Sequence, residues 1–377
     1  MSKKFFLVTT VPITLNFFQG QIQVFKKLFD VSLVSSPGIQ LENLEASEKV
    51  STHTVTMERN IAPLEDVKSL IGMIKLFKKE KPFLVHGNTP KGGLISMLAA
   101  YICRVQKRVY CIHGLRYQGN SGLKGFILRT MEKTTCALAT DLVTVSFGVA
   151  KTLSEDKITS KEVHVIANGS INGIDPNYFN PKIEFSVPEN LDFNTDKNSI
   201  VFGFVGRLVK DKGIVELVNA FVDLNKKHKN IKLLLVGNTE DLLDPLPDST
   251  KNHILNSKDI FSAGFQKDIR PYLKLMNVFT FPSYREGFGV SIMEAAAMGV
   301  PSISSNISGC NEIISDGYNG KLIPPKSTSH LQDAMESFIK NPELIKKYAS
   351  VSRKSVLEKY DQKIVWNAIE EFYTKLS

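Results

Sequence analysis

The segment Phe279–Glu294, FTFPSYREGFGVSIME, carries the clearest structural signal in the chain, a strand followed by a glycine loop and a helix. The apolar strand pattern ends at Pro282, and helical spacing begins near Val290. Gly287 and Gly289 lie between them, and residues without a Cβ let the backbone approach a ligand closely. In parallel α/β sheets, ligands bind at the carboxyl ends of the strands, so we expect a ligand site at this turn.

Two carboxylates flank this glycine loop. Glu286 precedes it, and Glu294 lies about one turn into the helix, on the same side as Val290 and Ser291. The free N–H groups of a helix start suit a phosphate or hydroxyl oxygen, and carboxylates accept hydrogen bonds from the paired hydroxyls of a sugar or ribose. The structural alternative is an acid that stabilises the helix start together with a solvated glutamate.

A second strand-to-helix turn carries two cations. In Phe202–Gly213, FGFVGRLVKDKG, the strand ends at Gly206, Arg207 follows at once, and Lys212 opens the next helix. A guanidinium and an ammonium at these positions can converge on one diphosphate, the first as a fork of donors and the second as a point charge. The alternative is a pair of unrelated surface cations.

Strand and helix patterns alternate along the whole chain, which predicts parallel sheets covered by helices on both faces. Helices are expected near Gly20–Leu28, Lys91–Val105, Lys212–Asn225, Val290–Met298 and Lys363–Leu376. Strands are expected at Lys4–Thr10, Phe83–Val85, Arg108–Ile112, Leu142–Val145, Val163–Ile166, Ser199–Phe204, Lys232–Val236, Asn277–Phe281, Pro301–Ser304 and Gly320–Ile323.

The chain of 377 residues is long enough for two domains. Residues 181–198 are polar and lack periodicity, which favours a linker there. We expect an α/β fold of two doubly wound, Rossmann-like domains, residues 1–180 and 199–377, facing across a cleft. The last helix could pack on either domain.

The N-terminal segment MSKKFFLVTT is basic and then apolar, as in a signal peptide. Pro12 and Asn16 interrupt it, no small-x-small cleavage site follows, and we expect a buried first strand. The longest apolar stretch elsewhere, Leu94–Val105, is far shorter than the roughly 18 residues that cross a bilayer. These features lead us to expect a cytoplasmic protein. The four cysteines form no C-x-x-C pair, which favours buried thiols over a metal or disulfide role.

Positive charge is concentrated in the first half of the chain. The net charge is +9, and residues 1–180 hold 22 Lys and Arg against 14 Asp and Glu, or +8. Between Tyr101 and Lys133, apolar residues interleave with seven cations, and Glu132 is the only acid. Basic and apolar residues together are typical of a surface that lies on a membrane. Nucleic-acid binding is not favoured because no nucleic-acid module is present; a buried helix with a basic outer edge is the remaining alternative.

These motifs together resemble the retaining glycosyltransferases of family 4, which have the GT-B fold. The C-terminal half carries the resemblance in GRLVKDKG, LLLVGN, SAGF and FPSYREGFGVSIMEAAAMGVPSISSNISGCNEIISDGYNGKLIPP. By resemblance, Arg207 and Lys212 bind the donor diphosphate and stabilise it as a leaving group. Glu286 holds the donor sugar, and Glu294 takes the ribose hydroxyls. Cys310 and Asn311 depart from the Pro-Glu that relatives often carry there.

The N-terminal half is similar to bacterial enzymes that build capsule, O-antigen and lipid-linked oligosaccharides, through residues 10–23, VHGNTPKGG, CIHGLRYQG and ANGSINGID. The resemblance and the motifs together give an expected catalytic set of Arg207, Lys212, Glu286 and His113. The expected donor-binding set is Gly20, Gly206, Arg207, Lys212, Asn238, Phe265, Glu286, Gly287, Phe288, Gly289, Val290 and Glu294. The expected acceptor side is Asn16, His86, Asn88, His113 and Arg116.

The expected reaction is transfer of a sugar, an N-acetylated or deoxy hexosamine, from a UDP-sugar to a polyprenyl-diphosphate-linked saccharide at the inner face of the plasma membrane. We expect no cofactor and no metal, because no D-x-D pair follows a strand and two cations face the diphosphate. Retention of configuration is implied by the resemblance. A UDP-N-acetylglucosamine 2-epimerase and a non-catalytic sugar-nucleotide scaffold are the alternatives. A dehydrogenase is disfavoured, since no G-x-G-x-x-G follows the first strand.

Overall fold

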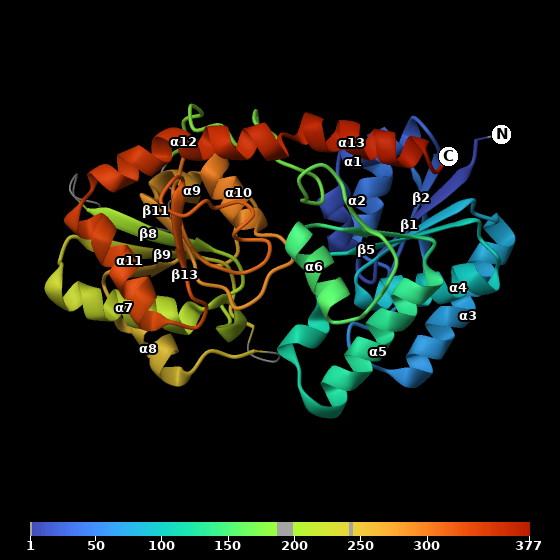
Figure 1. The fold of residues 1–377 in the computed structure, drawn as a ribbon, viewed down its shortest axis with the longest axis horizontal. Helices are drawn as coiled ribbons and strands as arrows, with labels where there is room; N and C mark the ends of the chain where they lie inside the picture. The colour runs from blue at the N-terminus through green and yellow to red at the C-terminus, as the bar shows by residue number, and fades with distance from the viewer. Residues whose placement is uncertain (1, 187–198, 241–243) are drawn as a thin grey trace. The chain divides into compact units, whose positions relative to one another are not determined.

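The computed structural model describes residues 2–186, 199–240 and 244–377 (Figure 1). The chain divides into two compact units. The first consists of Met1–Gly173 together with Gln362–Ser377, and the second consists of Ile174–Asp361. The expected division at residue 180 therefore moves to residue 173, and most of the expected linker, residues 187–198, lies outside the described residues.

The first unit is built on a parallel sheet with the strand order β3-β2-β1-β4-β5-β6-β7. Because the order reverses between β1 and β4, the carboxyl ends of these two strands form the switch point of the sheet. The strands are β1 (Lys4–Val8), β2 (Asp30–Ser35), β3 (Ser51–Thr54), β4 (Leu84–Asn88), β5 (Lys107–Ile112), β6 (Asp141–Thr144) and β7 (Val163–Val165).

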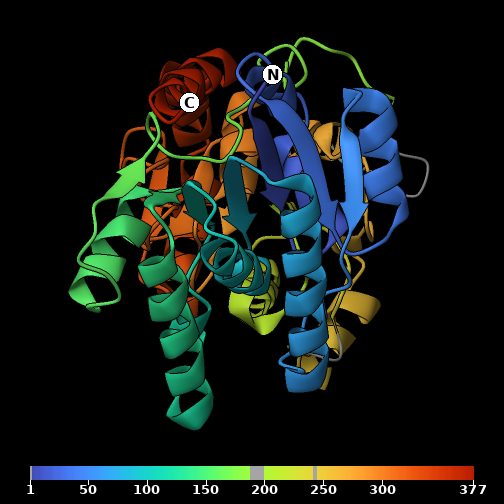
Figure 2. The same cartoon turned by 90° about the vertical axis from the view of Figure 1, so that its right-hand side faces the viewer.

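Helices cover both faces of this sheet because its strands bury apolar side chains on both sides. One face packs against α1 (Gln21–Lys26), α2 (Ile39–Glu48) and α13 (Gln362–Thr374). The other packs against α3 (Pro63–Glu80), α4 (Pro90–Ile102), α5 (Gly122–Leu138) and α6 (Phe147–Glu155). In Figure 2, where this unit faces the viewer, α3, α4 and α5 lie side by side on the sheet. Two short 3-10 turns, η1 (Pro12–Phe18) and η2 (Arg116–Gly119), complete the unit.

Helix α13 returns the end of the chain to the first unit, which answers the question that the sequence left open. Its apolar face, which includes Val365, Ile369 and Tyr373, is buried in the same core as Phe5 and Phe25. The Trp366 indole N–H donates a hydrogen bond of 2.6 Å to the side chain of Asn172, the residue before the unit boundary at Gly173.

The second unit has a parallel sheet in the order β10-β9-β8-β11-β12-β13, with its switch point between β8 and β11. Its strands are β8 (Ile200–Val205), β9 (Ile231–Val236), β10 (Ile260–Ser262), β11 (Val278–Phe281), β12 (Ser302–Ser305) and β13 (Gly320–Ile323). Figure 1 shows α7 (Ile214–Lys227), α8 (Asp248–Asn256) and α11 (Thr328–Lys340) on one side, and α9 (Arg270–Leu275), α10 (Val290–Ala297) and α12 (Glu343–Tyr360) on the other.

Two predicted helices begin later than expected, for the same physical reason. Gly213 has a φ of 72° and Gly20 a φ of 77°, in the left-handed region that glycine tolerates. Gly213 therefore separates α7 from the 3-10 turn η3 (Lys210–Lys212), and Gly20 separates α1 from η1.

The cysteines are free thiols, and Cys111, Cys136 and Cys310 are buried as expected. Within the described residues, no helix combines the length and apolar character that crossing a bilayer requires.

Candidate functional site

Three loops meet at the switch point of the second sheet, those that follow β8, β9 and β11. A side chain at Gly213 would overlap the carbonyl oxygen of Pro282, and one at Gly237 would overlap that of Gly206. Glycine is therefore required where these loops touch. The packing brings the predicted cation motif and the predicted Glu286–Glu294 motif into one site.

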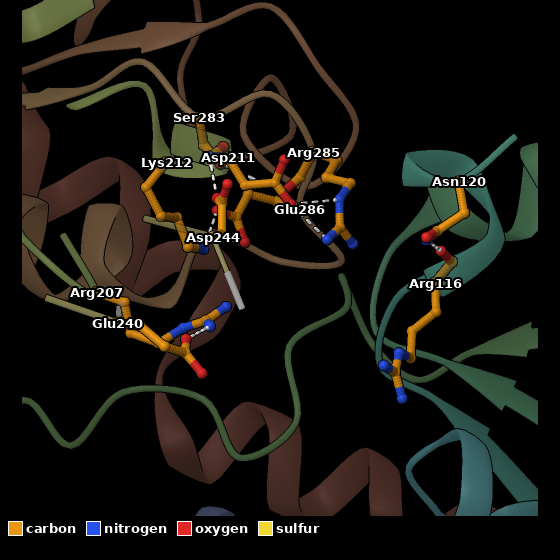
Figure 3. Close-up of polar contacts among 10 residues, drawn as sticks. All are labelled: Arg116, Asn120, Arg207, Asp211, Lys212, Glu240, Asp244, Ser283, Arg285 and Glu286. Atoms are coloured by element: carbon orange, nitrogen blue, oxygen red, sulfur yellow. Dashed lines mark hydrogen bonds and ion pairs between the residues drawn. The ribbon is translucent and has the colours of Figure 1, made fainter. Parts of the chain in front are cut away.

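The two predicted cations of this site are each paired with a carboxylate (Figure 3). The Lys212 ammonium donates to the Glu286 carboxylate, and both side chains are largely buried, with 19% and 11% exposed. The Arg207 guanidinium donates to Glu240, which lies in the loop after β9. Lys212 is predicted to bind the diphosphate and Glu286 the donor sugar. These two side chains are thus direct neighbours.

A second ion pair lies at the same turn. Arg285 donates to Asp211 through two nitrogens, at 2.5 and 3.0 Å. The Asp211 N–H in turn donates to the Asp244 carboxylate at 2.7 Å, and the Ser283 hydroxyl donates to the Asp211 carbonyl at 3.2 Å. These bonds connect the loops after β8, β9 and β11 to one another.

The glycine loop leads into α10 as the sequence predicts. The Gly289 N–H donates to the carbonyl of Gly309 at 2.9 Å, and a side chain at Gly309 would overlap the backbone of Gly287. The Phe288 ring is buried against Tyr360 with centroids 5.2 Å apart, so this residue offers a ligand its backbone only. The start of α10 at Val290 follows directly.

Glu294 lies half-buried on α10. Desolvation raises the pKa of this carboxyl to about 8. Hydrogen bonds donated by hydroxyl groups stabilise the ionised form of a carboxyl and lower its pKa again. This environment suits the ribose contact that the motif predicts.

Asn238 and Phe265 are also brought together, at the ends of β9 and β10. The Phe265 N–H donates to the Asn238 side-chain oxygen at 2.8 Å, and the Gly237 N–H donates to the carbonyl of Gly264 at 2.8 Å. The Phe265 ring is 69% exposed. An exposed ring beside the cation site is available to stack on a planar base.

In the first unit, Asn88 and His113 meet at the carboxyl ends of β4 and β5. The side-chain oxygen of Asn88 lies 2.8 Å from Nε2 of His113, while Nδ1 of the same ring is buried with no hydrogen-bond partner among the described residues. Desolvation lowers the pKa of His113 to about 4, so the ring is neutral near pH 7. A neutral ring with one free nitrogen can accept or donate one hydrogen bond to a ligand.

The carbonyl of His86 accepts a hydrogen bond of 3.3 Å from the Asn88 side chain, but the His86 ring lies in the aromatic core. Its ring is buried among Phe5, Phe18, Phe25 and Tyr373, and the Tyr373 hydroxyl lies 3.0 Å from its Nδ1. Burial lowers the pKa of His86 to about 3. The structure therefore shows His86 as a core residue that anchors α13.

The other predicted residues of the first unit lie apart from this pair. Asn16 is exposed on η1, and Gly20 packs against the Trp366 ring. Arg116 is exposed on η2, where its carbonyl accepts a hydrogen bond of 2.8 Å from Asn120 (Figure 3).

The sequence reasoning missed Glu240, Asp244 and the Asp211–Arg285 pair. The acids after the strand in LLLVGNTEDLLD are visible in the sequence, but their partners are about 30 residues away or more and depend on loop packing.

Comparison with known proteins identifies the family. The family model "Glycosyl transferase 4-like" matches residues 12–146, and "Glycosyl transferases group 1" matches residues 189–355. A capsular polysaccharide biosynthesis glycosyltransferase of Staphylococcus aureus is 34% identical, over 99% of this chain and 97% of its own length. The chain belongs to the family 4 glycosyltransferases. The expected family and enzyme class are thereby confirmed.

Further relatives of this glycosyltransferase agree with that assignment. A UDP-Gal:alpha-D-GlcNAc-diphosphoundecaprenol alpha-1,3-galactosyltransferase of Escherichia coli is 29% identical, over 78% of this chain and 76% of its own. The crystal structure of HepE from Anabaena with UDP and glucose has a TM-score of 0.78 at 18% identity, over 99% of this chain and 100% of that one. A sucrose-phosphate synthase from Thermosynechococcus elongatus has a TM-score of 0.79 at 18% identity, over 99% of both chains. The expected GT-B fold of two Rossmann-like domains is confirmed.

Proposed function

We propose that this glycosyltransferase moves a sugar from a UDP-sugar to a polyprenyl-diphosphate-linked saccharide in the synthesis of a bacterial surface polysaccharide. The observation that carries the donor half is the meeting of Arg207, Lys212 and Glu286 at one switch point, beside the start of α10. The acceptor half is supported by the relatives, whose names specify capsular polysaccharide synthesis and a diphosphoundecaprenol acceptor. An N-acetylated or deoxy hexosamine remains our proposed sugar.

In this proposal, the residues of the second unit act on the departing diphosphate. Negative charge builds on the β-phosphate as the bond to the anomeric carbon breaks, and Arg207, Lys212 and the start of α10 stabilise it. Two cations can supply this stabilisation without a metal, so we propose metal independence. Within the described residues, no cluster of three or more His, Cys, Asp or Glu side chains could hold a metal ion.

Glu286, already bonded to Lys212, is placed to accept hydrogen bonds from the donor sugar. We propose that the configuration is retained by attack of the acceptor hydroxyl on the face that the diphosphate leaves, with a leaving phosphate oxygen taking the hydroxyl proton. His113, neutral and with one free ring nitrogen, is proposed to orient a sugar or acceptor hydroxyl.

We also propose that the first unit binds the inner face of the cytoplasmic membrane, where a polyprenyl-linked acceptor resides. Some of the apolar residues between Tyr101 and Lys133 are buried, namely Leu115, Tyr117 and Leu128. Others are exposed on α5, namely Leu123, Phe126 and Ile127. Within residues 101–133, the proposed membrane-facing surface is therefore limited to the first two turns of α5, including exposed Lys124.

The function is tested by incubating the full-length protein with a panel of UDP-sugars and measuring free UDP, with and without a polyprenyl-diphosphate-linked acceptor. We expect one donor to release UDP only when the acceptor is present, with an unchanged rate after EDTA treatment. Loss of activity in EDTA and its recovery with Mn²⁺ would refute metal independence. Conversion of UDP-N-acetylglucosamine without any acceptor would favour the epimerase, and no consumption of any donor would contradict the proposal.

A further inference from the structure

Arg207 is the more exposed of the two donor-site cations, and a carboxylate from a different loop already pairs with it. Its side chain is 57% exposed, and that of Glu240 is 22% exposed. By contrast, Lys212 pairs with Glu286, which belongs to the predicted donor site itself. The Arg207–Glu240 pair thus brings a negative charge to the place where a diphosphate is expected.

The backbone fixes the position of Glu240 beside Arg207. The Leu208 N–H donates to the carbonyl of Asn238 at 2.8 Å, and Leu208 and Thr239 form a parallel bridge. These contacts extend the β8–β9 pairing by a few residues past the strand ends, so Glu240 follows directly on a paired segment.

We propose that Glu240 is a resident counter-ion of the donor-diphosphate site, a carboxylate that neutralises Arg207 in the empty enzyme and yields it to the diphosphate of the donor. This inference rests on the proposed function. Glu240 thereby lowers the affinity of the site for every nucleoside diphosphate, including the UDP product, and aids product release.

The exchange is physically easy in both directions. The pair is partly exposed to solvent, and an ion pair that water can screen contributes little to stability. A diphosphate offers several charged oxygens to the fork of the guanidinium and forms stronger, paired hydrogen bonds. The donor therefore displaces Glu240, while the nearby carboxylate still repels the dianion and returns to Arg207 as UDP leaves.

The test is calorimetric titration of UDP into the full-length protein and its Glu240→Gln variant. Removing the competing charge is expected to tighten UDP binding about two- to fivefold, in line with the value of a screened pair. Asp223→Asn is the matched control, because it removes one charge from an exposed i,i+3 pair with Lys226 on α7. It is expected to leave UDP affinity unchanged.

Two further arms separate the counter-ion role from a structural one. In an Arg207→Ala background, Glu240→Gln should strengthen UDP binding less than it does in the wild type, because only the repulsion between Glu240 and the diphosphate is then removed. Uridine, which has no phosphate, should bind the wild type and Glu240→Gln equally. Unchanged or weaker UDP binding by a folded Glu240→Gln protein would overturn this inference alone. Failure of the wild type to bind UDP would overturn both it and the proposed function.

Discussion

The environment of the Glu294 carboxyl predicts that UDP binding depends on pH. Desolvation raises the pKa of its carboxyl to about 8 in the ligand-free site. If the ribose hydroxyls donate to the ionised form, UDP binding must strengthen as the pH rises through 8, because fewer molecules then need to lose a proton on binding.

We predict that the affinity for UDP increases from about pH 7 to about pH 9 in the wild type, a range in which a phosphate with a pKa near 6 is already ionised. Glu294→Gln should bind UDP more weakly and show a flat profile. Calorimetry across this range checks the prediction, with Glu343→Gln on the exposed start of α12 as the control. A wild-type profile that falls with pH would contradict the ribose role.

The same shift makes a statement about stability. The folded-state pKa of Glu294 lies above its ordinary value of 4.5, so the unfolded chain loses its proton first as the pH rises. The contribution of the neutral carboxyl to stability is complete below pH 4.5 and is lost progressively up to pH 8. Glu294→Gln, which lacks the ionisable carboxyl, should therefore unfold at a higher temperature than the wild type at pH 8.

At the scale of single residues, the sequence predicted the site residues within each motif. It did not predict the contacts between residues of different motifs. Arg207, Lys212 and Glu286 are predictable because each lies in a strand-to-helix turn. The Arg207–Glu240 pair joins residues 33 positions apart and depends on which loops touch. His86, predicted on the acceptor side at the end of the strand Phe83–Val85, instead has its ring buried in the aromatic core.

At the scale of the elements, the start of α5 has an exposed apolar surface that a partner could cover. Leu123 and Phe126 are 75% and 67% exposed on its first turns, and α3 adds exposed Leu64 and Val67. In this parallel α/β unit, α3 and α5 both begin at the carboxyl end of the sheet and flank α4 (Figure 2). Exposed apolar groups on neighbouring helix starts, beside lysines, are typical of a surface that lies on anionic lipid.

We predict that replacing Leu123 and Phe126 by serine strongly reduces sedimentation of the protein with vesicles that contain phosphatidylglycerol. Leu255→Ser is the matched control, because this leucine is 79% exposed on α8 of the second unit, outside the proposed surface. Equal sedimentation of the double variant and the wild type would show that α5 does not bind the membrane. Equal binding to neutral vesicles would show that the lysines contribute nothing.

Elements with strong apolar patterns were predicted, and those with weak patterns were missed. β11 and α10 differ from expectation by one residue at an end. β3, with the sequence STHT, contains no aliphatic residue and became a strand only through its register with β2. α13 was predicted as a helix, but its partner depends on Tyr373 and the buried His86, which no local pattern reveals.

For the molecule as a whole, the sequence predicted two parallel α/β units, and the structure shows a switch point in the sheet of each unit. The first unit is made of two segments distant in the sequence, since the chain leaves it at Gly173 and returns at Gln362. Composition did not reveal this path, because the return depends on the apolar face of one helix. The proposed donor chemistry involves the second unit, whose motifs lie within one continuous segment.

The central claim is that Lys212 binds the diphosphate of a uridine nucleotide in the second unit, and its most direct test is titration of UDP into the full-length protein and Lys212→Met. A charge-assisted hydrogen bond contributes about 1.5–3 kcal/mol, so the variant should bind UDP at least about tenfold more weakly than the wild type. Lys226→Met, on the exposed face of α7, is the control and should bind UDP as the wild type does. Equal UDP affinity in Lys212→Met and the wild type would contradict the account.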